Sequence, residues 1–219
     1  TWESYCVDGV NLAREEAFCV DSTHGMNPFC IDTPDSLLEP AWAAQREYIE
    51  QYITDTETAL FGDDFADAEK GYTAYIDVDS AVSYFLVNEL FKNPDGAVTS
   101  FFLYKKRNGK IFFGPIWDFD LAMGNAGYDG VDETDGWHIR PSPWFARLFQ
   151  DPAFEEKVKA RWQALKADGT LDEIFHYAEA RATWLDKQQQ KNYELWDVTD
   201  FDKWINHPSG SMGSYETEV

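Results

Sequence analysis

Basic side chains are scarce in this 219-residue sequence. Only 18 Lys and Arg stand against 40 Asp and Glu, so the formal net charge at pH 7 is −22. A nucleic-acid backbone is bound through a basic face, and an anionic membrane surface is bound in the same way. The charge balance therefore argues against both kinds of partner.

Long apolar runs and several familiar catalytic motifs are also missing. No stretch approaches 18 apolar residues, so we expect no membrane-spanning helix. Neither a Walker-type phosphate loop nor a Gly-x-Ser-x-Gly elbow occurs. Ser/His/Asp hydrolysis therefore has little support. The histidines lie in no recognisable catalytic setting: His24, His138, His176 and His207.

Cysteine is rare and confined to the start of the chain, at Cys6, Cys19 and Cys30. We favour buried free thiols, and one disulfide is the main alternative. Zinc bound by Cys19, His24 and Cys30 is least favoured, because their spacing matches no standard ligand pair and no fourth ligand is evident. The spacing leaves the pairing of the three cysteines open.

Apolar and aromatic residues, in contrast, are plentiful. They make up 44% and 16% of the sequence and include nine Trp, which is too much core-forming material for a disordered acidic chain. The length suits one large domain or two small ones. The surplus carboxylates predict a solvated surface and offer oxygen ligands for hard cations such as Mg²⁺, Mn²⁺ or Ca²⁺.

Hydrophobic periodicity predicts an α+β fold that is mostly helical, with a central β-hairpin at about residues 100–117. The hairpin is centred on Asn108-Gly109, a pair typical of a type I′ turn. Residues 1–35 contain chain breakers and are predicted to be irregular, whereas residues 208–219 are predicted to form a flexible tail. Helices are expected at about residues 41–60, 80–92, 143–149, 152–167 and 171–196.

Two acids far apart in the sequence are expected to meet at the open end of this hairpin. Asp95 lies in the loop before the first strand, and Asp118 follows the second strand. The predicted turn makes Arg107 oppose Lys110. The same register makes Thr99 oppose Asp118, with neighbouring strands about 4.8 Å apart. Because Asp95 shortly precedes Thr99, both carboxylates are expected at one end.

The order of an acidic loop, a hairpin and an Asp-Phe pair is that of a phosphotransferase lobe. In protein kinases, one Asp accepts the proton of the substrate hydroxyl, and a second Asp, followed by Phe, binds Mg²⁺ at the phosphates. This chemistry needs a base for the acceptor and a divalent cation for the anionic group that is transferred. On spacing alone, structural roles are the stronger alternative, with Asp95 as a turn residue and Asp118 as a strand-end cap.

Several blocks of the sequence closely resemble the CotH family, the atypical protein kinases related to spore coat protein H. The most specific block is Gly114-Pro115-Ile116-Trp117-Asp118-Phe119-Asp120. The resemblance extends over residues 24–196, most of the chain. Its other blocks are residues 79–95, 100–105, 121–125, 144–148, 151–154 and 161–162.

The resemblance implies a kinase-like C-terminal lobe over residues 36–207. It implies ATP-dependent phosphoryl transfer to Ser or Thr of a protein substrate, in an extracellular, cell-envelope or spore-coat setting. ATP with Mg²⁺ or Mn²⁺ would be the cofactor, and Ca²⁺ is an alternative cation.

The resemblance also implies roles for individual residues. Asp95 corresponds to the catalytic-loop acid, and Asp118 corresponds to the metal-binding acid. Asp120 is an additional metal ligand, with a structural role equally open. Supporting roles, in hydrogen bonding or ligand contact, fall to Asn88, Asn93, Ser100 and Asn125.

The sequence departs from the kinase pattern in two respects. Ser100 stands where ordinary protein kinases carry a metal-binding Asn, which puts a second metal in question. Residues 1–35 contain no Lys and no Gly-rich loop after a strand, although the strand-rich first lobe of a kinase supplies the phosphate-contacting Lys. We interpret this segment as a remnant of the inter-lobe region or of the first lobe. We therefore expect the chain alone to bind ATP weakly and to transfer phosphate poorly or not at all.

Two other functions remain compatible with the composition. A non-catalytic kinase-like lobe could bind a surface glycan or a protein, with aromatic rings stacking on sugars and acidic residues holding Ca²⁺. A glycoside hydrolase would use two carboxylates set several Å apart, but it does not explain the order of Asp, hairpin and Asp-Phe. No nucleotide-contacting residue is assigned by the sequence.

Overall fold

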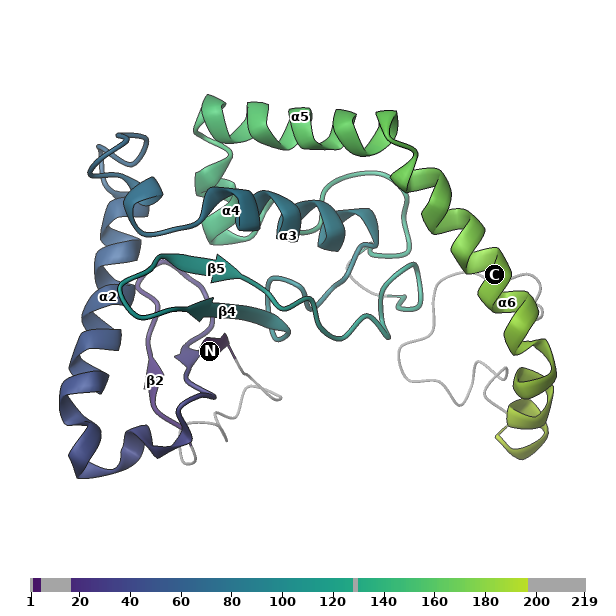
Figure 1. Ribbon diagram of the computed structural model, residues 1–219, viewed down its shortest axis with the longest axis horizontal. Helices are drawn as coiled ribbons and strands as arrows, with labels where there is room; N and C mark the ends of the chain where they lie inside the picture. The colour runs from purple at the N-terminus through teal and green to yellow at the C-terminus, as the bar shows by residue number, and fades with distance from the viewer. Residues whose placement is uncertain (1, 5–16, 128–129, 197–219) are drawn as a thin grey trace.

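The computed structural model describes residues 2–4, 17–127 and 130–196 of the chain. The fold is α+β and mostly helical, as predicted (Figure 1). The tail predicted at residues 208–219 lies outside the described residues, as do Cys6 and His207.

The helices lie close to where the hydrophobic periodicity predicts them. The 3-10 segments and helices are η1 (Asp35–Leu38), η2 (Pro40–Trp42), α2 (Ala43–Phe61), η3 (Tyr72–Ala74), α3 (Val78–Leu90), α4 (Pro143–Leu148), α5 (Pro152–Ala167) and α6 (Thr170–Leu195). At the start of α3, the Asp77 carboxylate accepts a hydrogen bond of 2.9 Å from Ser80 N, which caps the helix. Within the described ranges, no helix is both long enough and apolar enough to cross a membrane.

The strands of the described residues form one antiparallel sheet of five, in the order β2-β3-β1-β4-β5. β1 (Trp2–Ser4), β2 (Cys19–Val20) and β3 (Phe29–Cys30) all lie within residues 1–35. The prediction of an irregular segment there missed these strands, because runs of two or three residues carry no measurable alternation. β4 (Phe101–Lys105) and β5 (Ile111–Phe113) are the predicted hairpin, and β5 ends before residue 117.

The turn of this hairpin differs from the prediction by one residue. Gly109 N donates to Lys106 O at 2.9 Å, so the turn is not a type I′ turn centred on Asn-Gly. Leu103 pairs with Phe113 across the strands, whereas the predicted register would have placed Leu103 opposite Gly114. Burial explains the observed register. Leu103 and Phe113 are paired and both face the core, and moving one strand by one residue would turn its core-facing side chains toward solvent.

An aromatic core joins the sheet to the helices. Trp144 of α4 is 1% exposed, and its ring centroid lies 5.3 Å from that of Phe29 on β3 and 6.3 Å from that of Phe101 on β4. Tyr84 of α3 meets Phe101 edge to face at 5.6 Å. The central hairpin is therefore held by rings from β3, α3 and α4, and its open end is fixed relative to α3.

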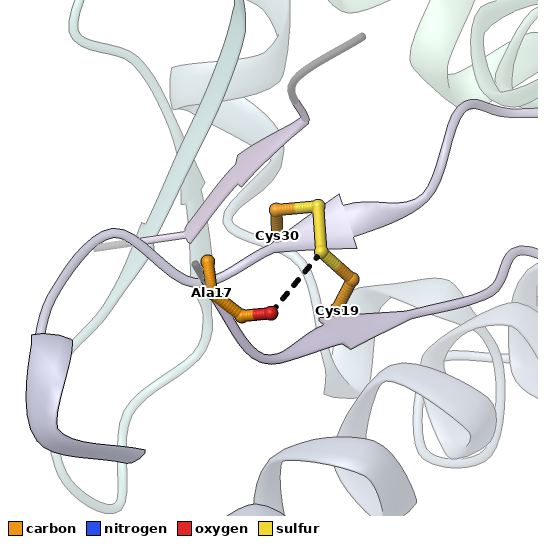
Figure 2. The surroundings of a disulfide bond; sticks show 3 residues. All are labelled: Ala17, Cys19 and Cys30. Carbon is orange, nitrogen blue, oxygen red and sulfur yellow. Dashed lines mark hydrogen bonds between the residues drawn. A yellow bond between two sulfur atoms is a disulfide. The ribbon is translucent and has the colours of Figure 1, made fainter. Parts of the chain in front are cut away.

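A disulfide joins Cys19 of β2 to Cys30 of β3 (Figure 2). The two residues are directly paired across the antiparallel strands, with Cα atoms 4.0 Å apart. The favoured interpretation of free thiols is therefore wrong for these two cysteines. Zinc binding by the same pair is also excluded, because both sulfurs are bonded to each other.

A buried carboxylate, Glu57 of α2, ties the N-terminal strands to α4. Glu57 is 2% exposed and accepts hydrogen bonds from Ser22 Oγ (2.6 Å), Thr23 N (2.9 Å) and Trp144 Nε1 (3.0 Å). Burial raises the pKa of Glu57, but these hydrogen bonds outweigh it and hold the pKa below its ordinary value. The ionised side chain therefore stabilises the fold above the ordinary pKa, and this contribution is lost as the pH falls through the lower folded-state pKa.

The variant Glu57→Gln should lower the free energy of unfolding at pH 7 by about 2 kcal/mol, because a charged acceptor of several hydrogen bonds is replaced by a neutral one. Urea unfolding at pH 7 and at pH 3.5 measures the difference from wild type, which should narrow at the lower pH. Glu47→Gln, at an exposed position of the same helix, is the matched control. An equal difference at both pH values would contradict the assignment.

Candidate active site

The loop that carries Asp95 follows α3 directly and leads into β4. Val98 N and Ser100 N both donate to Asp95 O at 3.0 Å. The buried Tyr84 hydroxyl lies 2.7 Å from Gly96 O and 3.2 Å from Ser100 O. The loop is thus shaped by its own backbone and by a side chain of α3, and Asp95 is held half-buried at the open end of the hairpin.

Asn93 connects this loop to the segment that carries Asp118. Its side chain is fully buried, and its Oδ1 accepts a hydrogen bond of 3.2 Å from Asp95 N. Its Nδ2 donates to Trp117 O at 3.5 Å and to Asn88 Oδ1 at 3.1 Å. The Asn93 side-chain amide therefore contacts the backbone of both segments that carry the acids. Asn88 Oδ1 accepts a hydrogen bond from this amide and thereby orients it.

Gly96 packs against the Asn88 side chain, which is hydrogen-bonded to Asn93. Substitution of Gly96 therefore tests how much this packing contributes to stability. A Cβ added at Gly96 would lie 2.3 Å from Asn88 Oδ1, so Gly96→Ala must displace the Asn88 side chain or the loop. We expect a loss of about 1–3 kcal/mol in the free energy of unfolding. Chemical unfolding of this variant beside Gly109→Ala, where an added Cβ would lie no closer than 3.4 Å to another atom, measures the steric effect. Equal losses in the two variants would contradict it.

The Asp118 segment follows β5 as an irregular loop. Asp118 is exposed and adopts the left-handed backbone region, with a φ of 60°. Phe119 meets Phe91 edge to face at 5.8 Å, and Met123 N donates to Phe91 O at 2.7 Å. The loop is therefore anchored to the end of α3, close to where the Asp95 loop begins.

The structure brings Asp95, Asp118, Asp120 and Ser100 into one electrostatic group. Desolvation, together with the neighbouring carboxylates of Asp120 and Asp95, raises the pKa of Asp118, and a hydrogen bond with the Ser100 side chain opposes this increase. Among the described residues, no ion pair involves any of the three acids. The site therefore concentrates negative charge that no ion pair within residues 2–4, 17–127 and 130–196 balances.

This charge fits a divalent metal bound through few protein ligands. In the described part of the chain, no group of three or more His, Cys, Asp or Glu side chains could by itself hold a metal ion. Mg²⁺ is usually held by one or two carboxylates, with phosphates and water completing its coordination. Asp118 and Asp120 can supply two carboxylates, and a cation would relieve the repulsion that raises the pKa of Asp118.

Asn125 takes part in a different way from the acids. Its Nδ2 donates to Asp120 O at 2.6 Å, which closes the loop that carries Asp120. The structure therefore gives Asn125 a supporting role in shaping the loop that carries Asp120. Asn88 and Asn93 support the loop that carries Asp95 through their side-chain hydrogen bonds.

Glu89 is a supporting residue that the sequence analysis missed. Its side chain is largely buried on α3, and its carboxylate accepts hydrogen bonds from His138 N (2.7 Å) and Ile139 N (2.8 Å). The His138 ring nitrogen Nε2 in turn lies 3.3 Å from Pro94 O, next to Asp95. The sequence signal that could have indicated this role was a carboxylate within the apolar stripe of a predicted helix, because a buried acid needs hydrogen-bond partners.

An acid on the loop before a hairpin, and an acid followed by Phe after it, form the arrangement that protein kinases have in their catalytic lobe. The model of the CotH kinase protein family matches residues 38–208. The chain therefore belongs to the CotH kinase family. No curated protein and no solved structure gives a significant match.

Proposed function

We propose that this chain carries the catalytic lobe of an ATP-dependent protein kinase that transfers phosphate to Ser or Thr. The observation that carries the proposal is the meeting of Asp95 and Asp118 at one end of the hairpin, where the Asp95 carboxylate helps to raise the pKa of Asp118 and where no ion pair among the described residues involves either acid. Membership of the CotH kinase family supports the reaction class.

In this proposal Asp95 is the base. It would accept the proton of the substrate hydroxyl as that oxygen attacks the terminal phosphate. Asn93 accepts the hydrogen bond of the Asp95 amide, and Tyr84 and the backbone bonds to Asp95 O fix the surrounding loop. These contacts hold the base in place before the substrate arrives, which is how positioning contributes to catalysis.

Asp118 and Asp120 are the residues that would hold a divalent cation, Mg²⁺ or Mn²⁺, with Ca²⁺ as an alternative. When bound, such a cation neutralises phosphate charge and polarises the transferred group. The Ser100 side chain, which opposes the increase in the pKa of Asp118, would help to keep this carboxylate ionised for the cation. The hydrogen bond that the Asn93 side chain donates from Nδ2 to Trp117 O fixes the position of the residue before Asp118.

We also propose an exported or cell-envelope location. The disulfide between Cys19 and Cys30 supports it, because disulfides form and persist in oxidising compartments. Fractionation of cells, followed by thiol labelling of the protein with and without reduction, tests this location. A protein found only in the cytoplasm with both thiols reduced would contradict it.

The test of the proposed activity is the incorporation of labelled phosphate from ATP into protein by the protein as its gene encodes it. We expect incorporation on Ser or Thr with Mg²⁺ or Mn²⁺, loss of incorporation on chelation with EDTA, and recovery when the metal is restored. Absence of incorporation with Mg²⁺, Mn²⁺ and Ca²⁺ would contradict the proposal. Glycan or protein binding that survives Asp118→Asn would then favour a non-catalytic binding module.

A further inference from the structure

The loop between β2 and β3 reaches the segment that carries Asp95. Asn27 Nδ2 donates a hydrogen bond of 2.8 Å to Val98 O, which lies 71 residues further along the chain. Val98 N in turn donates to Asp95 O at 3.0 Å. The main chain of Val98 is therefore bound on both sides, through its amide by the Asp95 loop itself and through its carbonyl by a distant segment.

This contact supports the middle of the Asp95 loop. Tyr84 of α3 contacts the carbonyls on either side of Val98, at Gly96 O and Ser100 O. Val98 is 49% exposed, so burial of its side chain alone does not fix this residue. Ser100 follows two residues later and belongs to the same electrostatic group as Asp118. A movement of Val98 would therefore be felt both at Asp95 and at Ser100.

Asn27 is itself held firmly within its own loop. The disulfide between β2 and β3 closes this loop at its base. Ser22 Oγ donates to the buried Glu57 carboxylate at 2.6 Å and accepts a hydrogen bond of 3.3 Å from Met26 N. Pro28 restricts the backbone of the preceding Asn27 to extended conformations. The Asn27 amide is therefore preorganised, and little freedom is lost when it binds its acceptor.

We propose that Asn27 is a positioning residue for phosphate transfer, which acts through the Val98 carbonyl to hold the segment from Asp95 to Ser100 in its reactive geometry. Asn27 precedes residues 38–208, which the family model matches, so the proposal rests on the contacts of this structure. The effect of Asn27 on the rate depends on the proposed kinase function, whereas its effect on the order of the Asp95 loop does not.

Substitution of Asn27 in the protein as its gene encodes it tests the effect on the rate. Asn27→Ala and Asn27→Asp both remove the amide donor, and Asp keeps the shape of the side chain. Each should lower kcat for the incorporation of labelled phosphate at least about tenfold and change KM for ATP less than about twofold, because small displacements of reacting groups are costly. A wild-type kcat in Asn27→Asp would overturn the proposal.

A matched control and a stability measurement exclude other causes of a slower rate. Asn108→Asp adds the same charge at an exposed position in the turn of the hairpin, away from its open end, and should keep the wild-type rate. The urea unfolding midpoint shows whether each variant is folded under the conditions of the assay. A loss of rate that is accounted for by unfolded protein would assign Asn27 to the stability of the fold and overturn the positioning role.

Amide hydrogen exchange tests the positioning role without any activity. Val98 N and Ser100 N both donate to Asp95 O, so their exchange rates report how often this loop opens. In Asn27→Asp, these two amides should exchange at least about tenfold faster, while the amides of α5 keep their wild-type rates. Unchanged exchange at Val98 and Ser100 would contradict the positioning role even if kcat fell.

The two experiments separate this inference from the proposed activity. If the wild-type protein transfers phosphate and Asn27→Asp is equally fast, the positioning role fails and the kinase proposal stands. If the wild-type protein transfers no phosphate, the kinase proposal fails, and hydrogen exchange still decides whether Asn27 orders the Asp95 loop.

Discussion

Asp95→Asn is expected to slow phosphate transfer by about 10²–10⁴-fold, the usual contribution of a positioned general base. The substitution keeps the shape of the side chain but removes its ability to accept the substrate proton. Because the loop is held by main-chain bonds to Asp95 O and by Asn93, the fold should be retained. The loss should therefore appear in kcat rather than in stability.

The measurement is the initial rate of labelled phosphate incorporation from ATP, together with the urea unfolding midpoint. Asp63→Asn, an exposed acid in the loop after α2, is the matched control and should keep the wild-type rate. A wild-type rate in Asp95→Asn would remove this residue from the mechanism. A slower rate accompanied by a lower unfolding midpoint would instead indicate that Asp95 has a structural role.

Trp144→Ala is expected to cost about 3–5 kcal/mol in the free energy of unfolding, a large part of the total of about 5–15 kcal/mol for a typical domain. The side chain is 1% exposed and contacts rings from β3 and β4. Its Nε1 also donates to Glu57 at 3.0 Å, so the substitution creates a cavity and removes a partner of a buried carboxylate.

Chemical unfolding monitored by circular dichroism measures this loss. Trp184→Ala is the natural comparison, because that side chain is 64% exposed on α6 and its removal should change stability by less than about 0.5 kcal/mol. Similar losses in the two variants would show that the aromatic core is not organised around Trp144.

The helices were predictable because their apolar residues repeat over several turns. Helix α5 has the predicted bounds, and α6 differs by one residue at each end. The N-terminal strands were not predictable, since β2 and β3 have two residues each and are defined by pairing with distant segments. The disulfide could not be predicted for the same reason, because Cys19 and Cys30 are brought together only by the pairing of β2 with β3.

The meeting of the two acids was predicted from the hairpin despite an error in its turn. A register shift of one residue moves the pairing but leaves both chain segments at the same open end, so Asp95 and Asp118 still share an electrostatic group. The contact from Asn93 to the Trp117 carbonyl could not be predicted from the sequence, because it depends on the path of an irregular loop.

The central claim is that Asp95 and Asp118 act as one phosphoryl-transfer site, and a double-mutant cycle of phosphate incorporation tests it most directly. Wild type, Asp95→Asn, Asp118→Asn and the double variant are compared in the protein as its gene encodes it. We predict that each single substitution costs at least about 10²-fold, and that the double variant is no more than about threefold slower than the slower single variant, because residues acting as a unit are not additive. A wild-type rate in either single variant, or losses that multiply fully in the double variant, would contradict the claim.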